Sequence, residues 1–315
     1  MLTPLVSIII PCYNYAQYLP DAIKSCLAQT HTNFEILVVD DGSGDDTSEV
    51  VRAFPEARYI YQDHRGVASA RNRGWGEAHG QFLQFLDADD VLLPSKIEEC
   101  LTTFAEHPEF GVVYTDYEVR TPDLTGRSVI QRPNWEMPEG EILQRLIKQS
   151  ASYFVPACAL IARPTVERLG GFNEQLAVVE DWFFWVNLAA NGVLFGHIPK
   201  ALAWYRDTPG SLSKQETLIA YCRLKAYEDL RALPIPRNLL NLDDALADRH
   251  HVLASKLWKY GEVAEARKHF MAAFKLQKKG RIARLLLLSL CGFTSLETAE
   301  KIFAWIKPNT VKQSR

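Results

Sequence analysis

The sequence predicts a doubly wound α/β sheet followed by an all-helical C-terminal appendage. Short runs rich in β-branched residues alternate with helix-length stretches over the first two-thirds of the chain, the pattern of βαβ units with right-handed crossovers. From about residue 217 onward only helical patterns remain. We therefore predict an α/β domain over residues 1–214 and a helical region over residues 215–315.

The strongest strand signal is the run Leu-Val-Ser-Ile-Ile-Ile at residues 5–10, which is typical of a central parallel strand covered on both faces. The first half continues with strands at 34–39, 58–61 and 82–86 and helices at 18–29, 47–54 and 67–78. The second half contains a helix from about 94, a strand ending at 116, a connection over 121–138, a helix at 141–149, a strand at 156–162, a helix at 182–191, and strands at 192–198 and 201–205.

Composition limits the function classes. A net charge of −3 over 315 residues argues against general nucleic-acid binding, which needs a clustered basic surface. The six cysteines are scattered without a C-x-x-C pair, so we expect reduced thiols rather than a disulfide framework or a zinc site. We see neither a signal peptide nor an apolar run of the ~20 residues that span a bilayer. We therefore expect a cytoplasmic protein, soluble or peripheral at the inner face of the membrane.

Three polar loops follow predicted strands, at residues 11–14, 40–43 and 87–90. Ligands of doubly wound sheets bind at the carboxyl ends of the strands, so these loops should converge. Neither G-x-G-x-x-G after the first strand nor G-x-x-x-x-G-K-[ST] anywhere is present, which argues against dinucleotide and P-loop sites. The remaining possibility is an acidic pocket. In such a pocket an aspartate accepts a hydrogen bond from a nucleobase or a ribose hydroxyl, and a divalent cation binds the phosphates.

The third loop carries Asp87, Asp89 and Asp90. Side chains alternate along an extended segment, so Asp87 and Asp89 should point the same way. Two such carboxylates repel one another unless a cation lies between them, and oxygen-only ligands favour Mg²⁺ or Mn²⁺. The alternative is a polar turn in which Asp90 caps the helix that starts near Pro94.

Six motifs in this order resemble the family 2 glycosyltransferases (GT2) of GT-A fold. They are Ile10-Pro11-Cys12-Tyr13-Asn14, Val39-Asp40-Asp41-Gly42-Ser43, Ala70-Arg71-Asn72, Asp87-Ala88-Asp89-Asp90, Gly170-Gly171-Phe172-Asn173-Glu174 and Glu180-Asp181-Trp182. The resemblance implies a mixed sheet with a Rossmann-like nucleotide-binding half and an acceptor half. Asn173, where relatives often have Asp, departs from the pattern.

The resemblance also implies residue roles on the donor side. It places the nucleotide-sugar against Pro11, Tyr13, Asn14, Asp40, Asp41, Arg71, Asp87 and Arg206. In the D-x-D motif, Asp89 would ligate the metal, and Asp87 would approach the ribose and sugar and share the metal. Arg71 would steady the diphosphate, although an ordinary surface arginine of a helix fits the same pattern. Arg206 would lie in a flexible loop that closes over the phosphates, with a plain Pro-Gly turn as the alternative.

On the acceptor side, the resemblance implies that Asp181 is the general base. An inverting transfer needs one carboxylate to take the proton of the attacking hydroxyl and needs no protein nucleophile. Glu180 and Trp182 would lie on the acceptor side, Glu180 binding acceptor or orienting the loop. The competing interpretation makes Asp181 an N-cap and the aromatic residues after it core packing. Asp116 ends a strand, where exposure to solvent is favoured over a contact with the sugar.

Two observations concern the helical region. Gly261, Ala266, Phe270 and Ala273 have spacings similar to one tetratricopeptide-like hairpin, and a single such hairpin cannot form a solenoid. Basic residues from Lys256 to Arg284 lead into the apolar run 285–293. Such a stretch can bind an anionic lipid surface, or it can form a core helix with a solvated charged face.

Together these features predict a metal-dependent inverting hexosyltransferase that uses a nucleotide-diphospho-sugar, UDP-linked, and acts in surface polysaccharide biosynthesis. The acceptor would be a hydroxyl of a glycan or lipid-linked molecule. Two rivals stay open: a catalytically silent sugar-nucleotide-binding protein, and a sugar nucleotidyltransferase, which should carry a Gly- and Lys-rich loop after the first strand.

Overall fold

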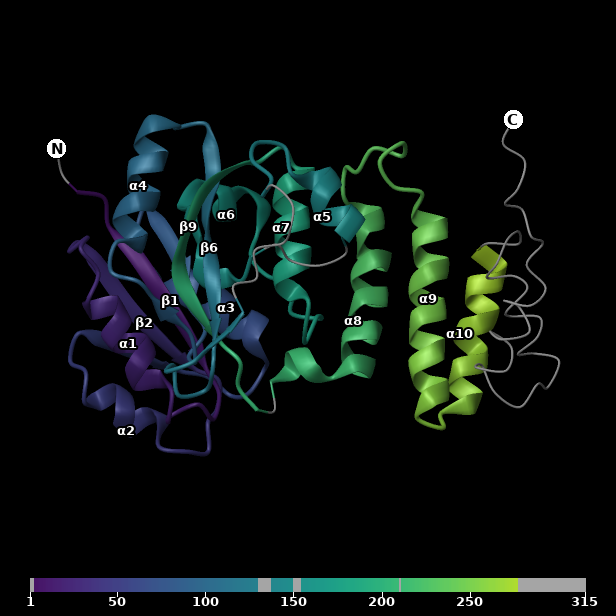
Figure 1. Ribbon diagram of the computed structural model, residues 1–315, viewed down its shortest axis with the longest axis horizontal. Helices are drawn as coiled ribbons and strands as arrows, with labels where there is room; N and C mark the ends of the chain where they lie inside the picture. The colour runs from purple at the N-terminus through teal and green to yellow at the C-terminus, as the bar shows by residue number, and fades with distance from the viewer. Residues whose placement is uncertain (1–2, 130–136, 150–153, 210, 277–315) are drawn as a thin grey trace. The chain divides into compact units, whose positions relative to one another are not determined.

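The computed structural model describes residues 3–129, 137–149, 154–209 and 211–276 (Figure 1). The chain forms two compact units that divide between Leu212 and Ser213. We call them unit 1 and unit 2 and describe each by itself.

Unit 1 is built on one mixed sheet. Its order is β3 (Ala57–Tyr61), β2 (Phe34–Asp40), β1 (Val6–Cys12), β4 (Phe82–Phe85), β8 (Ala159–Ala162), β6 (Phe110–Arg120), β9 (Leu194–Arg206) and β5 (Val91–Leu92), with β7 (Arg127–Val129) paired to β6. The first four strands are parallel, as the sequence predicts. β8 then runs antiparallel to both β4 and β6, so the sheet is mixed.

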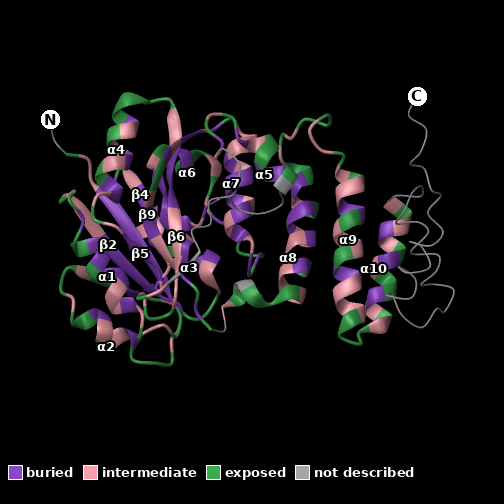
Figure 2. Ribbon diagram, in the orientation of Figure 1, coloured by how far each residue is buried: buried purple, intermediate pink, exposed green. Residues whose placement is uncertain are grey.

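Helices join these strands and cover the sheet. They are α1 (Leu19–Leu27), α2 (Thr47–Arg52), α3 (Val67–Glu77), α4 (Lys96–Glu106), α5 (Leu143–Gln149), α6 (Arg163–Leu169) and α7 (Glu180–Ala190). Every residue of β1 is buried, while helices such as α1 and α2 expose one side to solvent (Figure 2). The apolar runs therefore mark the centre of the sheet and the amphipathic stretches its cover.

The last long strand differs from the sequence prediction. The segments predicted as strands at 192–198 and 201–205 form one strand, β9, which pairs with β6. Its register shifts between the pairs Thr115↔Ile198 and Asp116↔Ala201. Pro199 lies at this irregularity, and a proline is tolerated at a bulge because its missing N–H is not needed there.

Two local predictions are also corrected. Residues 156–162 are not one strand, because Pro156–Cys158 form a 3₁₀ turn before β8. Asp90 does not cap α4, whose N-cap is Ser95. Pro94 thus precedes the helix instead of opening it.

Unit 2 contains α8 (Glu216–Asp229), a 3₁₀ turn at Leu230–Ala232, α9 (Leu242–Lys259) and α10 (Val263–Leu276). Gly261, with φ of +84°, lies in the turn between α9 and α10. Ala247, Ala254, Ala266, Phe270 and Ala273 form a small buried core between these two helices. The tetratricopeptide-like assignment stays a prediction, and the run 285–293 lies outside the described residues. Within those that are described, no helix combines the length and apolarity needed to cross a membrane.

Candidate active site

The site is assembled at the carboxyl ends of β1, β2 and β4, where the three polar loops meet. Asn14 and the turn after β2 bind one another directly: the amide of Asn14 donates to Ser43 Oγ at 2.9 Å, and the Gly44 amide donates to Asn14 Oδ1 at 2.8 Å. Asn14 adopts φ of 56°, a conformation that asparagine tolerates better than most residues. Pro11 is buried within β1, opposite Val39 of β2.

The two aspartates after β2 have different surroundings. Asp40 accepts the Ser43 amide at 2.8 Å and the Tyr59 hydroxyl at 2.6 Å. Partial burial of Tyr59, and then its hydrogen bond to Asp40 and the charge of Asp40, raise the pKa of that phenol. Asp41 is buried and accepts from the Gln62 side chain and from the amides of Arg65 and Gly66. Asp41 therefore holds the loop 62–66 in place.

That loop brings His64 onto Tyr13. The two rings stack with centroids 4.0 Å apart, and Tyr13 is 43% exposed. Gly42, with φ of +79°, lies against the same loop, since a Cβ there would come within 2.9 Å of the His64 amide. The open aromatic surface of Tyr13 thus depends on Gly42 and Asp41, which fix the histidine behind it.

The D-x-D segment forms a turn after β4 and not the extended segment that the sequence predicts, because the Asp90 amide donates to the Asp87 carbonyl at 3.0 Å. Asp87 and Asp89 are partly exposed, whereas Ala88 and Asp90 are buried. Burial, and then the negative charge of Asp87, raise the pKa of Asp89 to about 6, while Thr208 Oγ1 donates to Asp89 at 3.1 Å. A nearby cation would stabilise the ionised form of Asp89.

The residues fit a metal only in part. Across the described ranges, no three His, Cys, Asp or Glu side chains are grouped so that they could enclose an ion. Asp87 and Asp89 would therefore supply an incomplete shell of oxygen ligands. Mg²⁺ and Mn²⁺ sites commonly use one or two carboxylates and complete the shell with water and substrate phosphates.

Arg206 departs from the predicted flexible loop. It is the last residue of β9, it is 3% exposed, and its guanidinium donates to the carbonyls of Asp89 and Pro122 and to Asp21 Oδ2. Its backbone amide donates to Asp90 Oδ1 at 3.0 Å. Burial and the charges of Asp89 and Asp87 raise the pKa of Asp90 well above its usual range. Arg206 therefore fixes the turn that presents Asp89, and its contact with donor phosphates stays a prediction.

Arg71 lies at the centre of the site and is only 2% exposed. One terminal nitrogen lies 2.6 Å from Asp87 Oδ1, and the other lies 2.6 Å from Glu180 Oε1. The guanidinium also lies 5.0 Å from the centre of the Phe172 ring. The alternative of a surface arginine is therefore wrong. Both terminal nitrogens of Arg71 bind carboxylates in the structure, so a contact of Arg71 with a diphosphate stays a prediction.

The second carboxylate centre is the first turn of α7. The N-cap is Val179, which has φ of 60°, so Asp181 lies inside the helix and is not its cap. A β-branched residue in this left-handed conformation is strained, and such strain gathers at functional sites. Burial raises the pKa of Glu180 to about 7 against the opposing effect of Arg71. Asp181 is half-buried and accepts its neighbour's amide at 2.6 Å.

Trp182 is buried in the structure, and its place on the acceptor side stays a prediction. Its side chain is 2% exposed, and its indole N–H donates to the Leu146 carbonyl at 3.0 Å, which ties α5 to α7. Asp116, expected to be exposed, is 9% exposed and lies 2.9 Å from His197 Nε2. Both side chains therefore have structural partners that the sequence did not indicate.

Sequence reasoning assigned no role to Asn72, which the structure places at a junction. Its side chain donates to the Phe172 carbonyl at 2.9 Å and accepts the Phe172 amide at 2.8 Å, as a paired strand would. It also donates to Glu174 Oε1 at 3.0 Å. Asn72 therefore docks the loop before α7 onto α3. In the sequence, the one indication of this role was its position beside Arg71 in a family motif.

Comparison with known proteins identifies the family of this chain. Residues 7–170 match the family described as Glycosyl transferase family 2. An uncharacterized glycosyltransferase of Rickettsia prowazekii is 32% identical over 232 residues, which cover 72% of this chain and 70% of that protein. Chondroitin synthase of Escherichia coli is 31% identical over 201 residues, 62% of this chain but 28% of the synthase.

Solved structures show the same fold. TarS of S. aureus in complex with UDP-GlcNAc superposes with a TM-score of 0.68 at 18% identity, covering 95% of this chain and 91% of that one. The mannosyltransferase PcManGT from Pyrobaculum calidifontis, in complex with GDP-Man and Mn²⁺, gives a TM-score of 0.57 at 20% identity and covers 97% and 85%.

The fold is that of the GT-A glycosyltransferases. The chain belongs to glycosyl transferase family 2.

Proposed function

We propose that this chain is a metal-dependent inverting glycosyltransferase that moves a sugar from a UDP-linked donor to a hydroxyl of a glycan or lipid-linked acceptor. We place this reaction in surface polysaccharide biosynthesis. The UDP-GlcNAc complex of TarS and the name of the E. coli relative support the donor and the acceptor class. The Mn²⁺ of PcManGT supports the metal.

One observation carries the proposal: a single guanidinium joins the carboxylates of two segments far apart in sequence. Arg71 binds Asp87, after β4, and Glu180, at the start of α7, with 2.6 Å to each. Because Glu180 and Asp181 are consecutive, the D-x-D segment and the proposed base are held beside one another. A transferase that joins two substrates needs this proximity of donor and acceptor groups.

On the donor side, the exposed face of Tyr13 and the carboxylate of Asp40 would receive the nucleobase and ribose. Asp87 and Asp89 would hold Mn²⁺ or Mg²⁺, which, when bound, neutralises charge that develops on the leaving diphosphate. The buried Arg206 keeps Asp89 oriented by binding its carbonyl. Oriented charges of this kind stabilise the transition state more than the ground state.

On the acceptor side, Asp181 would accept the proton of the attacking hydroxyl. The new bond forms between that oxygen and the anomeric carbon, and the bond from this carbon to the diphosphate oxygen breaks. The nucleoside diphosphate leaves with the electron pair, and attack opposite the leaving group inverts the anomeric centre. Glu180, paired with Arg71, orients the first turn of α7.

The test is nucleotide release from UDP-, GDP- and dTDP-sugars with and without Mn²⁺, using the wild type and Asp181→Asn. We expect slow, Mn²⁺-dependent hydrolysis of a UDP-sugar by the wild type. Addition of the correct acceptor should restore fast transfer only in the wild type, with a loss of about 10³-fold or more in Asp181→Asn at unchanged donor affinity. Binding of UDP without turnover of any donor, with glycan acceptors present, would favour a silent binding protein.

Unit 2 has no catalytic part in this proposal. We propose that residues 215–315 form the helical appendage, with α9 and α10 as a tetratricopeptide-like hairpin. Peripheral membrane contact through its basic and apolar C-terminal residues is a further part of the proposal. Recovery of the whole protein with anionic vesicles, compared with neutral ones, tests it.

A further inference from the structure

Glu174 lies where the two sides of the site in unit 1 meet. Its Oε1 accepts the side-chain amide of Asn72 at 3.0 Å, and its Oε2 accepts from Arg65 Nη2 at 3.3 Å. Asn72 belongs to α3, whereas Arg65 belongs to the loop 62–66 that precedes this helix. One carboxylate therefore connects both segments to the loop before α7.

The loop 62–66 belongs to the nucleotide side of the site. The buried carboxylate of Asp41 accepts the Arg65 amide at 2.9 Å, and His64 Nδ1 lies 2.8 Å from the same carboxylate. His64 in turn stacks on Tyr13 with ring centroids 4.0 Å apart. The backbone that carries Arg65 is therefore fixed together with the ring that lies behind Tyr13.

The loop before α7, residues 170–179, leads to Asp181. Near its start, Asn72 binds both backbone groups of Phe172. At its end, Val179 has φ of 60°, which is strained for a β-branched residue. A strained residue keeps its conformation only while the contacts around it hold the chain in place. Each further contact of this loop therefore stabilises the arrangement that presents Asp181.

The contact between Arg65 and Glu174 differs from the buried contacts around it. The two side chains are 66% and 40% exposed, so water screens their attraction. An exposed ion pair contributes little to the stability of a fold, and it therefore forms and breaks at little cost. Its closure can respond to a ligand, whereas burial keeps the pair of Arg71 and Glu180 closed.

We propose that the Arg65–Glu174 pair couples nucleotide binding to the position of the loop before α7. This inference rests on the proposed function, which places the nucleobase on Tyr13 and the general base at Asp181. A nucleobase that stacks on Tyr13 favours the arrangement in which His64 supports that ring, and Arg65, next to His64, then pairs with Glu174. Donor binding thereby holds the loop that presents the general base.

Arg65 and Glu174 are positioning residues in this proposal, and their coupling to the nucleotide is reciprocal. If UDP strengthens the ion pair, then loss of the pair weakens UDP binding by the same factor. This holds even when the substituted residue is Glu174, which lies on the other loop. An exposed ion pair can transmit an effect of about two- to fivefold.

The experiment measures amide hydrogen exchange in residues 172–179 of the whole protein, with and without saturating UDP and Mn²⁺. The variants are Arg65→Gln and Glu174→Gln, which remove one charge each, and Arg65→Lys, which keeps the charge. Glu174→Gln leaves a side-chain oxygen that can still accept from Asn72. Calorimetric titration gives the UDP affinity of each variant.

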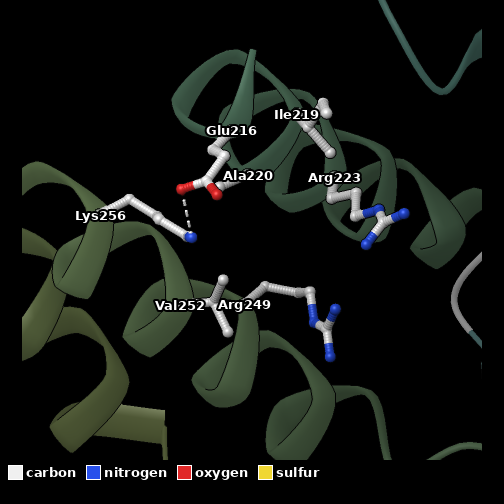
Figure 3. Close-up of a pocket in the computed structure, with 7 residues that line it drawn as sticks. All are labelled: Glu216, Ile219, Ala220, Arg223, Arg249, Val252 and Lys256. Carbon is white, nitrogen blue, oxygen red and sulfur yellow. Dashed lines mark hydrogen bonds and ion pairs between the residues drawn. The ribbon is translucent and has the colours of Figure 1, made fainter. Parts of the chain in front are cut away.

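Lys256→Gln is the matched control, because it breaks an exposed ion pair elsewhere. Lys256 Nζ of α9 donates to Glu216 of α8 at 2.5 Å, beside a cavity of about 260 Å³ between these two helices (Figure 3). Both side chains are partly exposed. This pair belongs to unit 2 and shares no residue with the two loops, so its loss should change neither UDP affinity nor exchange in residues 172–179.

We expect UDP to slow exchange in residues 172–179 by about two- to fivefold in the wild type and in Lys256→Gln. This protection should be lost in Arg65→Gln and in Glu174→Gln, and largely retained in Arg65→Lys. UDP affinity should fall by about two- to fivefold in both Gln variants. The double variant should lose no more than either single one, because all three lack the same contact.

Equal protection by UDP in the wild type and Arg65→Gln, or no protection in the wild type while UDP is bound, would overturn this proposal. Additive losses in the double variant would also contradict it, because the two side chains would then act separately. Failure of the wild type to bind UDP would contradict the donor side of the proposed function and, with it, this inference.

Discussion

Arg71 and Glu180, which are 109 residues apart in sequence, form a buried ion pair with a distance of 2.6 Å. The same guanidinium binds Asp87, so the pair connects the strand end that carries the D-x-D motif to the helix that carries Asp181. Neither Arg71 nor Glu180 is accessible to a large substrate. The pair instead fixes the position of the more accessible D-x-D motif relative to Asp181.

The first prediction concerns this ion pair. Arg71→Met should lower the free energy of unfolding by about 3–5 kcal/mol, because it leaves Glu180 buried without its partner. Arg73→Met is the control: Arg73 lies on the same helix in an exposed pair with Glu77, and its loss should cost less than about 1 kcal/mol. Denaturant unfolding compares the two variants. If both variants lost the same free energy of unfolding, the buried ion pair of Arg71 would contribute no more to stability than the exposed pair of Arg73.

Arg71→Lys tests whether Arg71 positions the catalytic groups, as distinct from stabilising the fold. A lysine ammonium keeps the charge but cannot span Asp87 and Glu180 as a planar fork does. We expect kcat to fall by about 100-fold while the KM for the donor changes little, since the donor loop 11–14 does not depend on this contact. A rise in KM with unchanged kcat would instead assign Arg71 to direct donor binding.

The second prediction concerns the metal. Asp89→Asn should weaken nucleotide binding by about tenfold or more in the presence of Mn²⁺, and should leave metal-free binding nearly unchanged. Asp123→Asn, which alters an exposed aspartate in a turn, serves as the control. Calorimetric titration with UDP gives both affinities. Equal Mn²⁺ dependence in the wild type and Asp89→Asn would remove Asp89 from the ligand set.

The sequence was most informative where structure depends on local pattern. The strands at the centre of the sheet are buried on both faces, so their apolar runs stand out, and the predicted α/β fold class is confirmed. The exposed side of Asp87 and Asp89 was predicted from strand alternation, whereas in the structure it results from the turn after β4. The boundary of β9 was missed because a proline inside a run normally ends a strand, whereas here a bulge accommodates it.

The environment of the charged residues could not be read in this way. Arg206 is buried because its donors meet acceptors from three distant segments, at Asp21, Asp89 and Pro122. Asn72 looks like a solvated helix residue until the backbone of Phe172 is placed beside it. Long-range contacts of this kind leave no periodic trace in the sequence, and only the family resemblance pointed to the segments concerned.

The third prediction tests the docking of the loop before α7. A Cβ at Gly171 would come within 2.1 Å of Asn72 Oδ1 and 2.7 Å of Trp75 Nε1. Gly171→Ala should therefore displace the loop, cost about 1–3 kcal/mol and reduce transfer, because Asp181 follows this loop. Gly76→Ala, in open space at the end of α3, should stabilise the protein by up to about 1 kcal/mol. Equal stability of the two variants would contradict this docking.

The fourth prediction is a pH dependence of the stability of unit 2. His250 Nδ1 of α9 lies 3.0 Å from His269 Nδ1 of α10, and burial together with the neighbouring ring lowers the pKa of His250 from 6.5 to about 4. Burial lowers the pKa of His269 as well, against the opposing charge of Glu265. The unfolded chain therefore binds more protons than the folded one between pH 4 and 6.5.

Stability of unit 2 should accordingly be complete above about pH 6.5 and should fall as the pH drops towards 4. Solvent screening of the half-exposed His250 ring limits its share to about 1 kcal/mol. Amide hydrogen exchange in α9 and α10 should speed up in this window, relative to the β1 strand of unit 1. In His250→Gln the extra opening should be smaller, because one of the two rings no longer titrates; an unchanged pH profile would show that another group controls it.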